Sequence, residues 1–324
     1  MSASGVLLGA LAAAGLLACA ATPAIAQQYP NKPIRMLIPF VAGGTTDVLA
    51  RVVSQQMSED WKVQVVPDNH PGANGIIAAE MAAKAAGDGY TLLFVAMGHA
   101  VNPLMYKKLP YDTERDFTPI SLVGTFAQMV LVNPSVPAKD LKELIALAKN
   151  GPKPLSYASG GIGSSQHLGG ALLAYMAGIK MDHVPYKGGS PGLLDVIAGN
   201  VNLMVTQPTS MAFITSGKLR ALAISSPQRS PKHPDLPTVA EAGVPGYQSL
   251  AWYGLVGPKN MPPEVLKKIS EETMRATRSK QMQDALNAQG GDPVGGTPAE
   301  FSAYIKAETS RYAKVVKEAG ISAD

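Results

Sequence analysis

Cysteine is almost absent from this chain of 324 residues, since Cys19 is its only one. We expect cleavage after Ala26, which would leave a protein with neither a disulfide framework nor a thiolate metal site. Charged residues are also few, at 16% of the chain, and Lys and Arg form no run with interleaved aromatic residues. The net charge of +4 is therefore spread thinly, which argues against nucleic acid as a partner. It suits capture of small acidic solutes, although solubility alone would explain it equally well.

The dinucleotide and nucleotide motifs of common enzyme classes are missing as well. The sequence has no complete G-x-G-x-x-G in its glycine-rich segments and no P-loop lysine after them. Ser164 and His167 stand one helical turn apart, and this local spacing does not make a catalytic triad with Asp195. The five histidines show no metal-ligand spacing. We expect no catalytic residue, no metal and no cofactor; the alternative is a secreted α/β hydrolase or transferase that acts on a carboxylate.

The first 26 residues carry no charged side chain. An apolar stretch is followed by Ala24-Ile25-Ala26, a pattern typical of a secretory signal peptide with its cleavage site. We therefore expect residues 1–26 to be removed and the protein to be periplasmic. The usual basic residues at the start are missing, which leaves the start position open. A membrane anchor is one alternative, although the apolar stretch is barely long enough, and lipid attachment at Cys19 is another.

Strands and helices alternate along the chain, and the hydrophobic pattern restarts after Pro119. The β-α-β-α-β order predicts a parallel sheet with right-handed crossovers in each half, and the length favours two domains. In the first half we expect strands at 34–39, 63–66 and 90–95 and helices at 46–61 and 76–86. In the second half we expect strands at 129–133, 155–158, 183–186, 201–205 and 218–225 and helices at 138–150, 166–177 and 192–198.

Two long amphipathic helices are predicted near the end of the chain, at 264–288 and 298–319. Such helices most simply pack on the first lobe, so the chain would cross between lobes twice, near 120–128 and near 248–258. We therefore expect an α/β fold of two lobes with a parallel-type sheet in each and the C-terminal helices on lobe 1. The predicted division is 27–125 with 254–324 for lobe 1 and 126–253 for lobe 2.

Two glycine-rich turns each lead from a predicted strand into a predicted helix. They are PFVAGGTTD at 39–47 and SYASGGIGSSQHLGG at 156–170. Glycine lets backbone amides point into a concavity, and the start of a helix adds unpaired N–H groups and the positive end of the dipole. The two turns predict an anion held between the lobes. The alternative for either turn is a tight connection without a ligand.

Other segments offer weaker candidates. Met97, His99 and Asn102 follow a predicted strand at its carboxyl end, where open α/β sheets place ligands, although loop packing explains them equally well. Lys187, within 186–190, is either a donor to the far end of a ligand or a surface charge. Trp252 and Tyr253 are interpreted as packing residues between the lobes, with ligand stacking as the alternative.

Nearly the whole chain after residue 26 resembles a known family, the extracytoplasmic solute receptors of tripartite tricarboxylate transporters, also called Bug-type receptors. The resemblance is carried, in this order, by YPNKPIRMLIPFVAGGTTDVLAR, NHPGANG, KAAGDGYTLL, NPLMYKKLPYD, DFTPIS, YASGGIGSSQHL, VPYKGGSPGLLDVIAGNV, SGKLRALAISS and LPTVAEAGVPGY. It implies a two-lobed, Venus-flytrap periplasmic binding protein that closes over a small organic mono- or dicarboxylate. It also implies delivery of that ligand to membrane transporter subunits or a sensor, and we expect a monomer.

The resemblance further implies that the ligand carboxylate is gripped where the two glycine turns face each other, partly through ordered waters. The corresponding residues are Phe40, Gly43, Gly44, Thr45, Thr46 and Asp47 in the first turn and Ser159, Gly160, Gly163, Ser164, Ser165, Gln166 and His167 in the second. Asp47 is interpreted as a helix-start residue that organises the loop, because a carboxylate would repel an anion.

The sequence departs from the family pattern at three positions. Thr206, followed by Gln207, stands where family members often carry aspartate, which argues against selection of an amino group and leaves this end of the site neutral. Asn74 stands where glycine is usual, and His70 where arginine is common. These two departures weaken the case for a ligand role of the loop at 71–75.

Overall fold

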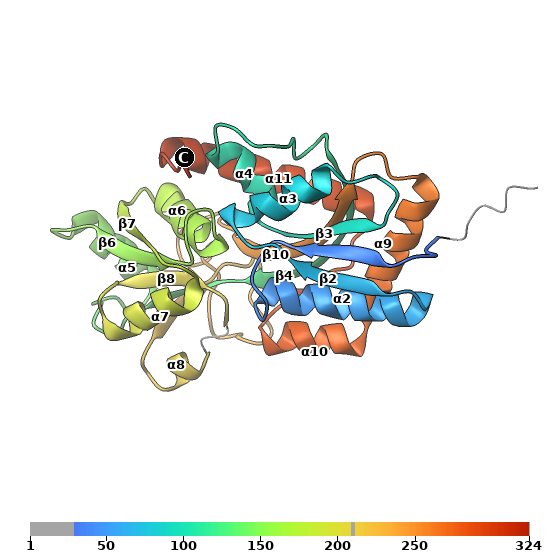
Figure 1. The fold of residues 1–324 in the computed structure, drawn as a ribbon. Coiled ribbons are helices and arrows are strands. Elements are labelled where there is room, and N and C mark those ends of the chain that lie inside the picture. The colour runs from blue at the N-terminus through green and yellow to red at the C-terminus, as the bar shows by residue number, and fades with distance from the viewer. Residues whose placement is uncertain (1–28, 209–210, 324) are drawn as a thin grey trace, which may run out of the picture. The chain divides into compact units, whose positions relative to one another are not determined.

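Two β-sheets form the framework of the protein in this computed structural model, which describes residues 29–208 and 211–323 (Figure 1). The predicted signal peptide and Cys19 lie outside the described residues. The first sheet has six strands in the order β11-β4-β10-β3-β1-β2. Their bounds are β1 (Ile34–Ile38), β2 (Val65–Asn69), β3 (Thr91–Ala96), β4 (Phe117–Ala127), β10 (Leu250–Pro258) and β11 (Asp292–Pro293).

The amino-terminal part of this sheet has the predicted parallel arrangement, because β1 pairs in parallel with both β2 and β3. Ile34, Met36, Leu37 and Ile38 are fully buried, as expected for a strand covered on both faces. The connections run through helices α2 (Thr45–Trp61) and α3 (Ile76–Ala83), the latter preceded by the short 3₁₀ helix η1 (Ala73–Gly75).

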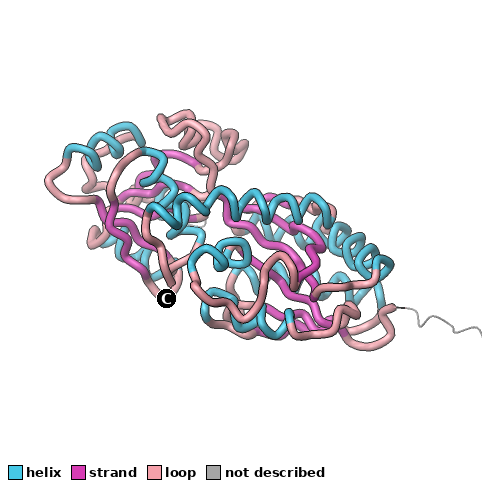
Figure 2. Tube along the Cα trace, turned by 90° about the horizontal axis from the view of Figure 1, so that it is seen from above, coloured by secondary structure: helices cyan, strands magenta, loops and turns pink. Residues whose placement is uncertain are grey.

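The second sheet has five strands in the order β7-β6-β8-β5-β9. Figure 2 shows the strands of the two sheets as separate groups with helices over them. The strands are β5 (Met129–Val132), β6 (Leu155–Ser159), β7 (Met181–Pro185), β8 (Leu203–Thr206) and β9 (Arg220–Ile224). The helices are α5 (Leu141–Asn150), α6 (Ser165–Ala177), α7 (Gly189–Ala198) and α8 (Met211–Thr215).

Both sheets are mixed, so the prediction of a parallel-type sheet in each lobe was wrong in part. β10 is antiparallel to β3 and β4, and β5 is antiparallel to β8 and β9, whereas β6 is parallel to β7 and β8. The physical reason is the double crossing of the chain. β4 leaves the first sheet and β10 returns to it, so the two strands run in opposite directions along nearly their whole lengths.

A buried polar cluster lies where these strands leave the first sheet. The amide of Gln128 donates to Ser225 Oγ (2.7 Å), and the Gln128 carbonyl accepts from the Ser225 amide (2.7 Å). Ser225 Oγ in turn donates to the carbonyl of Ser249, and Ser249 Oγ lies 3.1 Å from the hydroxyl of Tyr312. The backbone groups of Gln128 and Ser225 at this crossing are thus paired outside the regular strands.

The C-terminal helices cover the first sheet, as predicted. α9 (Pro263–Arg278) and α11 (Pro298–Glu318) pack on β4, and α10 (Lys280–Ala288) lies beside α2 (Figure 1). The single helix predicted at 264–288 is wrong, because Ser279 has an extended backbone and its side chain caps α10 by accepting from the Met282 amide. An additional helix, α4 (Gly98–Met105), packs against α11. Within the described ranges, every helix is too short or too polar to cross a membrane.

Candidate functional site

A cleft of about 910 Å³ opens beside both sheets at the carboxyl ends of their strands. Its wall includes residues that directly follow β1, β3, β6, β7 and β8, which is where open α/β sheets bind ligands. Many of these lining residues were predicted from the sequence. They are Phe40, Gly44, Thr45, Thr46, Met97, Gly160, Gly163, Ser164, Ser165, Gln166 and Gln207.

The first glycine turn presents the start of α2 to the cleft. Gly44 is the N-cap residue and, having no side chain, cannot cap the helix. The first intrahelical bond runs from the Val48 amide to the Gly44 carbonyl (3.0 Å). The amides of Thr45, Thr46 and Asp47 precede this bond and have no acceptor within the helix. The Thr45 hydroxyl donates to Gln289 Oε1 at 2.5 Å, whereas the Thr46 hydroxyl adds to the free amides in the cleft wall. These groups make this end of α2 a donor surface with a positive dipole.

Asp47 does not line the cleft, since its carboxylate turns back to hold the loop. It accepts from the Gly43 amide (2.9 Å), from Arg51 Nε (2.9 Å) and from Asn69 Nδ2 (2.9 Å). Burial opposes its ionisation, but the bonds from Arg51, Gly43 and Asn69 outweigh burial and lower the pKa of Asp47. The loop-organising interpretation of Asp47 agrees with these contacts. The Gly43 amide, which was predicted to face the anion, is used inside the loop.

The second glycine turn likewise uses its glycine amides internally. Gly160 donates to Gln166 Oε1 (3.3 Å), Gly161 to Ser159 Oγ (3.1 Å) and Gly163 to His167 Nδ1 (3.1 Å). The amides of Gly43, Gly160, Gly161 and Gly163 are therefore not free for an anion, so for these four residues the predicted cradle of turn amides was wrong. What remains for a ligand is the start of α6, where Ser164 Oγ caps only the His167 amide. The amides of Ser165 and Gln166 have no acceptor within the helix.

Ser159 and His167 lie behind the second turn and do not line the cleft. Ser159 is fully buried, and its Oγ lies 2.6 Å from His183 Nε2. The rings of His167 and His183 stack with centroids 3.8 Å apart. Burial, together with the neighbouring His183, lowers the pKa of His167 to about 3, and burial lowers that of His183 to about 4. Both imidazoles are therefore neutral near pH 7 and support the turn from the interior.

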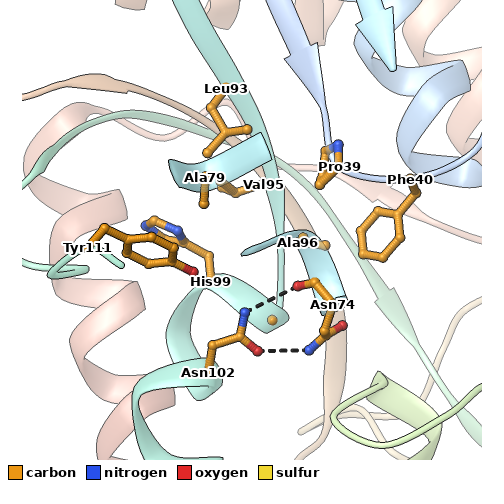
Figure 3. Close-up of a pocket in the computed structure, with 12 residues that line it drawn as sticks. Pro39, Phe40, Asn74, Ala79, Leu93, Val95, Ala96, His99, Asn102 and Tyr111 are labelled. Carbon is orange, nitrogen blue, oxygen red and sulfur yellow. Dashed lines mark hydrogen bonds between the residues drawn. The ribbon is translucent and has the colours of Figure 1, made fainter. Parts of the chain in front are cut away.

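His99 and Asn102 face a separate small cavity of about 20 Å³ behind Phe40 (Figure 3). The segment after β3 forms helix α4, and this helix turns the side chains of His99 and Asn102 inward. His99 packs edge-on against Phe117 at 4.9 Å, and burial lowers its pKa to about 4. Of the three residues predicted here, the structure places only Met97 in the cleft wall.

Thr206 is buried within β8 and does not line the cleft, whereas Gln207, one residue further, does. The Gln207 amide donates to the Tyr253 hydroxyl at 3.5 Å. Trp252 and Tyr253 belong to β10 and line the cleft as well. Trp252 is fully buried and packs edge-on against Phe301 of α11, so most of its ring is used in the core.

Asn74 lies in the cleft wall, although its departure from the family pattern had weakened the case for a ligand role of its loop. Its side-chain nitrogen would be 2.7 Å from a Cβ placed on Gly163 of the opposite turn. Met105 Cε would be 2.5 Å from the same Cβ. Only a glycine at 163 permits this approach between the first and second lobes. His70, in contrast, bonds Arg35 and Asp68 outside the cleft wall.

The electrostatics of the cleft favour an anion. Lys187 is the only charged side chain among the described lining residues, and it forms no ion pair within the described part of the chain. The ends of α2 and α6 add their positive dipoles. Across residues 29–208 and 211–323, His, Cys, Asp and Glu form no group of three that could hold a metal ion.

Comparison with known proteins gives consistent matches. A family model described as "Tripartite tricarboxylate transporter family receptor" matches residues 49–321. Protein BugT of Bordetella pertussis is 36% identical over 303 residues, which cover 93% of each chain. The solved structure of R. palustris Rpa4515 with adipate is 35% identical, with a TM-score of 0.80, and the match covers 91% of this chain and 99% of that one. MatC from Rhodopseudomonas palustris with bound malate is 30% identical, with a TM-score of 0.76 and coverages of 89% and 100%.

Proposed function

Because this chain belongs to the family of tripartite tricarboxylate transporter receptors, we propose that it captures a small organic carboxylate between its two lobes. The observation that carries the proposal is the pair of helix starts, α2 and α6, that open onto one cleft. Their free amides, together with the Thr46 and Ser165 hydroxyls, can donate hydrogen bonds that a carboxylate accepts. No acidic side chain stands among the described lining residues to oppose it.

The relatives indicate which carboxylates to test first. Rpa4515 was solved with adipate and MatC with malate, and both ligands are dicarboxylates. The cleft of about 910 Å³ has room for either. Dicarboxylates are therefore the first candidates, and monocarboxylates are the second.

The receptor role places the protein in the periplasm, after removal of residues 1–26 as a signal peptide. It would act as a monomer and deliver its ligand to a tripartite tricarboxylate-type membrane transporter or a sensor. Lobe 1 would comprise 27–125 with 254–324, and lobe 2 would comprise 126–253. The predicted boundary at 125/126 falls near the end of β4 and the one at 253/254 falls inside β10, so these two strands would form the hinge.

A thermal-shift screen followed by calorimetry tests the proposal. Mono- and dicarboxylates of two to eight carbons, including aromatic ones, are added to the purified protein without its signal peptide. A ligand at a hundred times its Kd should stabilise the folded protein by about 2.7 kcal/mol. Saturation at one ligand per chain is expected. If no carboxylate shifts the melting curve while another class of solute does, the proposal fails.

The enzyme alternative makes a different prediction. A receptor returns its ligand unchanged, whereas a hydrolase or transferase would convert it. Proton NMR of the bound carboxylate before and after prolonged incubation with the protein distinguishes the two. New product signals would contradict the receptor role.

A further inference from the structure

The backbone of Asn74 fixes the orientation of the Asn102 side-chain amide, which lies behind the cleft wall. Asn102 Nδ2 donates to the main-chain carbonyl of Asn74 at 3.2 Å. A carbonyl oxygen can only accept, so the nitrogen of Asn102 must point toward it. The other end of the same amide, Asn102 Oδ1, then faces the Asn74 side chain and accepts from Asn74 Nδ2 at 2.9 Å.

This pair leaves the side-chain oxygen of Asn74 turned away from Asn102 (Figure 3). The backbone of Asn74 lies in the left-handed region, with φ 50° and ψ 37°, which asparagine tolerates better than most residues. Its Nδ2 would be 2.9 Å from a Cβ on Gly98 and 2.7 Å from one on Gly163. The amide is therefore held between the start of α4 and the second glycine turn and cannot flip without losing its bond to Asn102 Oδ1.

Asn74 Oδ1 has no hydrogen-bond partner in the part of the chain that the structure describes. It is a fixed acceptor in the wall of a cleft whose other polar groups are mainly donors. An acceptor repels the oxygens of a carboxylate, so the group that it recognises on a ligand must be a donor.

Two donors are common on small organic acids, namely a hydroxyl and an ammonium group. An ammonium group would meet the positive ends of α2 and α6 and the Lys187 charge, with no acidic side chain among the described lining residues to compensate. A hydroxyl carries no charge and avoids this cost. The cleft therefore favours the hydroxyl.

From this geometry we propose that Asn74 is a specificity-determining residue that accepts a hydrogen bond from a hydroxyl group of the ligand. The inference rests on the proposed carboxylate-binding function and narrows it to hydroxy-substituted carboxylates. The ligand's carboxylate would bind the helix starts, while its hydroxyl would reach Asn74 Oδ1 beside Gly163.

Calorimetry with pairs of acids that differ by one hydroxyl tests this assignment. Suitable pairs are L-malate with succinate, 2-hydroxyglutarate with glutarate, and lactate with propionate. In the wild-type protein, the hydroxy acid of at least one pair should bind about three- to tenfold more tightly, as expected for one neutral hydrogen bond. In Asn74→Gly, which keeps the left-handed backbone accessible, the ratio within that pair should fall to about one.

Ser165→Ala serves as the matched control, because it removes a hydroxyl donor at the start of α6 and leaves the acceptor Asn74 Oδ1 in place. It should weaken both members of a pair equally and leave their ratio unchanged. Circular dichroism and melting curves verify that each variant folds. If the wild type binds carboxylates without preferring a hydroxy acid in any pair, or if Asn74→Gly keeps the preference, the role of Asn74 is overturned while the receptor function stands. If the wild type binds no carboxylate at all, the proposed function itself fails.

Discussion

The backbone amide of Gly163 donates to Nδ1 of His167 at 3.1 Å. An imidazole therefore supports the second glycine turn from the protein interior, and it must be unprotonated at that nitrogen to do so. His167 shares this neutral state with His99 and His183, whose pKa values are also lowered by burial. The buried histidines consequently link folding to pH.

His99 gives the cleanest test of this link, because it lies away from the turns. Its pKa is about 4 in the folded protein and about 6.5 when unfolded. Between these values the unfolded chain binds the extra proton, so stability is lost as the pH falls below 6.5. By pH 5 this single group should lower the free energy of unfolding by about 2 kcal/mol relative to pH 7.

His99→Phe removes the titrating imidazole and keeps an aromatic ring against Phe117. Urea denaturation of both proteins at pH 7, 6 and 5 should show a smaller loss of stability in the variant. The comparison is made by difference because other groups titrate in the same range. Burial raises the pKa of Glu272 to about 7, for example. Its protonation stabilises the folded protein as the pH falls and so offsets the effect of one histidine. Equal losses in the two proteins would show that His99 titrates normally in the folded state.

Gly163→Ala should impair closure of the cleft. Gly163 has φ 76°, and an added Cβ would meet Met105 Cε at 2.5 Å and Asn74 Nδ2 at 2.7 Å. The left-handed backbone alone costs an alanine about 1–2 kcal/mol. In addition, the clash of the new Cβ with Met105 and Asn74 would push the two lobes apart. We expect at least a tenfold loss of carboxylate affinity by calorimetry and a larger radius of gyration in solution scattering with ligand.

Gly178→Ala is the control for backbone strain. Gly178 ends α6 with φ 62°, and a Cβ there would meet no atom within 4 Å. It should lower stability by a similar amount and leave affinity unchanged. If Gly178→Ala lost as much affinity as Gly163→Ala, general destabilisation would explain the loss in both variants.

The features that could be predicted were those that depend on residues close together in the sequence. The apolar strand Ile34–Ile38 and the glycine-rich turns follow from local composition and were located correctly. The antiparallel pairing of β4 with β10 was missed because it joins segments more than a hundred residues apart. Whether a loop amide is free also depends on partners such as His167 and Asp47, which spacing alone does not reveal.

Asn74 shows the same limit within the site. Its place where glycine is usual in the family argued against a ligand role, and the residues that orient it are distant along the chain. Asn102 lies 28 positions later, on a helix that was not predicted, and Gly163 belongs to the other lobe. Only the three-dimensional structure brings these groups together.

Gly44→Val should abolish ligand binding while the fold persists. Gly44 has φ −79°, and the nearest atom to an added Cβ is the Val41 carbonyl oxygen at 3.7 Å, so the backbone accepts a side chain. The branched side chain would cover the free amides at the start of α2. Loss of two charge-assisted hydrogen bonds of about 1.5–3 kcal/mol each predicts an affinity at least about a hundredfold lower.

Gly296→Val provides a comparison away from the cleft. A Cβ at Gly296 would make only ordinary contacts with Glu300 and Leu122, at 3.6 Å or more. Its affinity for carboxylates should equal that of the wild type in calorimetry. If Gly44→Val bound as tightly as Gly296→Val, the anion site would have to lie elsewhere.

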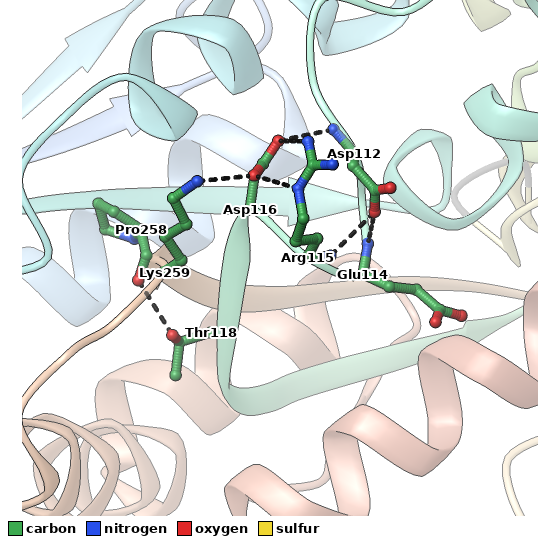
Figure 4. Close-up of polar contacts among 7 residues, drawn as sticks. All are labelled: Asp112, Glu114, Arg115, Asp116, Thr118, Pro258 and Lys259. Carbon is green, nitrogen blue, oxygen red and sulfur yellow. Dashed lines mark hydrogen bonds and ion pairs between the residues drawn. The ribbon is translucent and has the colours of Figure 1, made fainter.

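Asp116 should contribute to stability without affecting the ligand. It ties the start of β4 to the end of β10, since its carboxylate accepts from Arg115 (3.1 Å), from the Asp112 amide (2.9 Å) and from Lys259 Nζ (3.1 Å) (Figure 4). These bonds, led by that of Arg115, hold the pKa of Asp116 well below its usual range. Its stabilising effect is therefore present above the unfolded pKa near 4 and is lost as the pH falls further.

Asp116→Asn should lower the Tm at pH 7, because the amide cannot accept from all three donors and leaves two cations without their partner. The difference from the wild type should shrink below pH 4, where the wild-type carboxylate becomes protonated in the unfolded chain and loses its advantage. Glu114→Gln is the control, since Glu114 belongs to the same loop but its carboxylate points away from Asp116 (Figure 4). Scanning calorimetry should find the Glu114→Gln protein unchanged, and a Tm difference for Asp116→Asn that did not depend on pH would contradict an electrostatic origin.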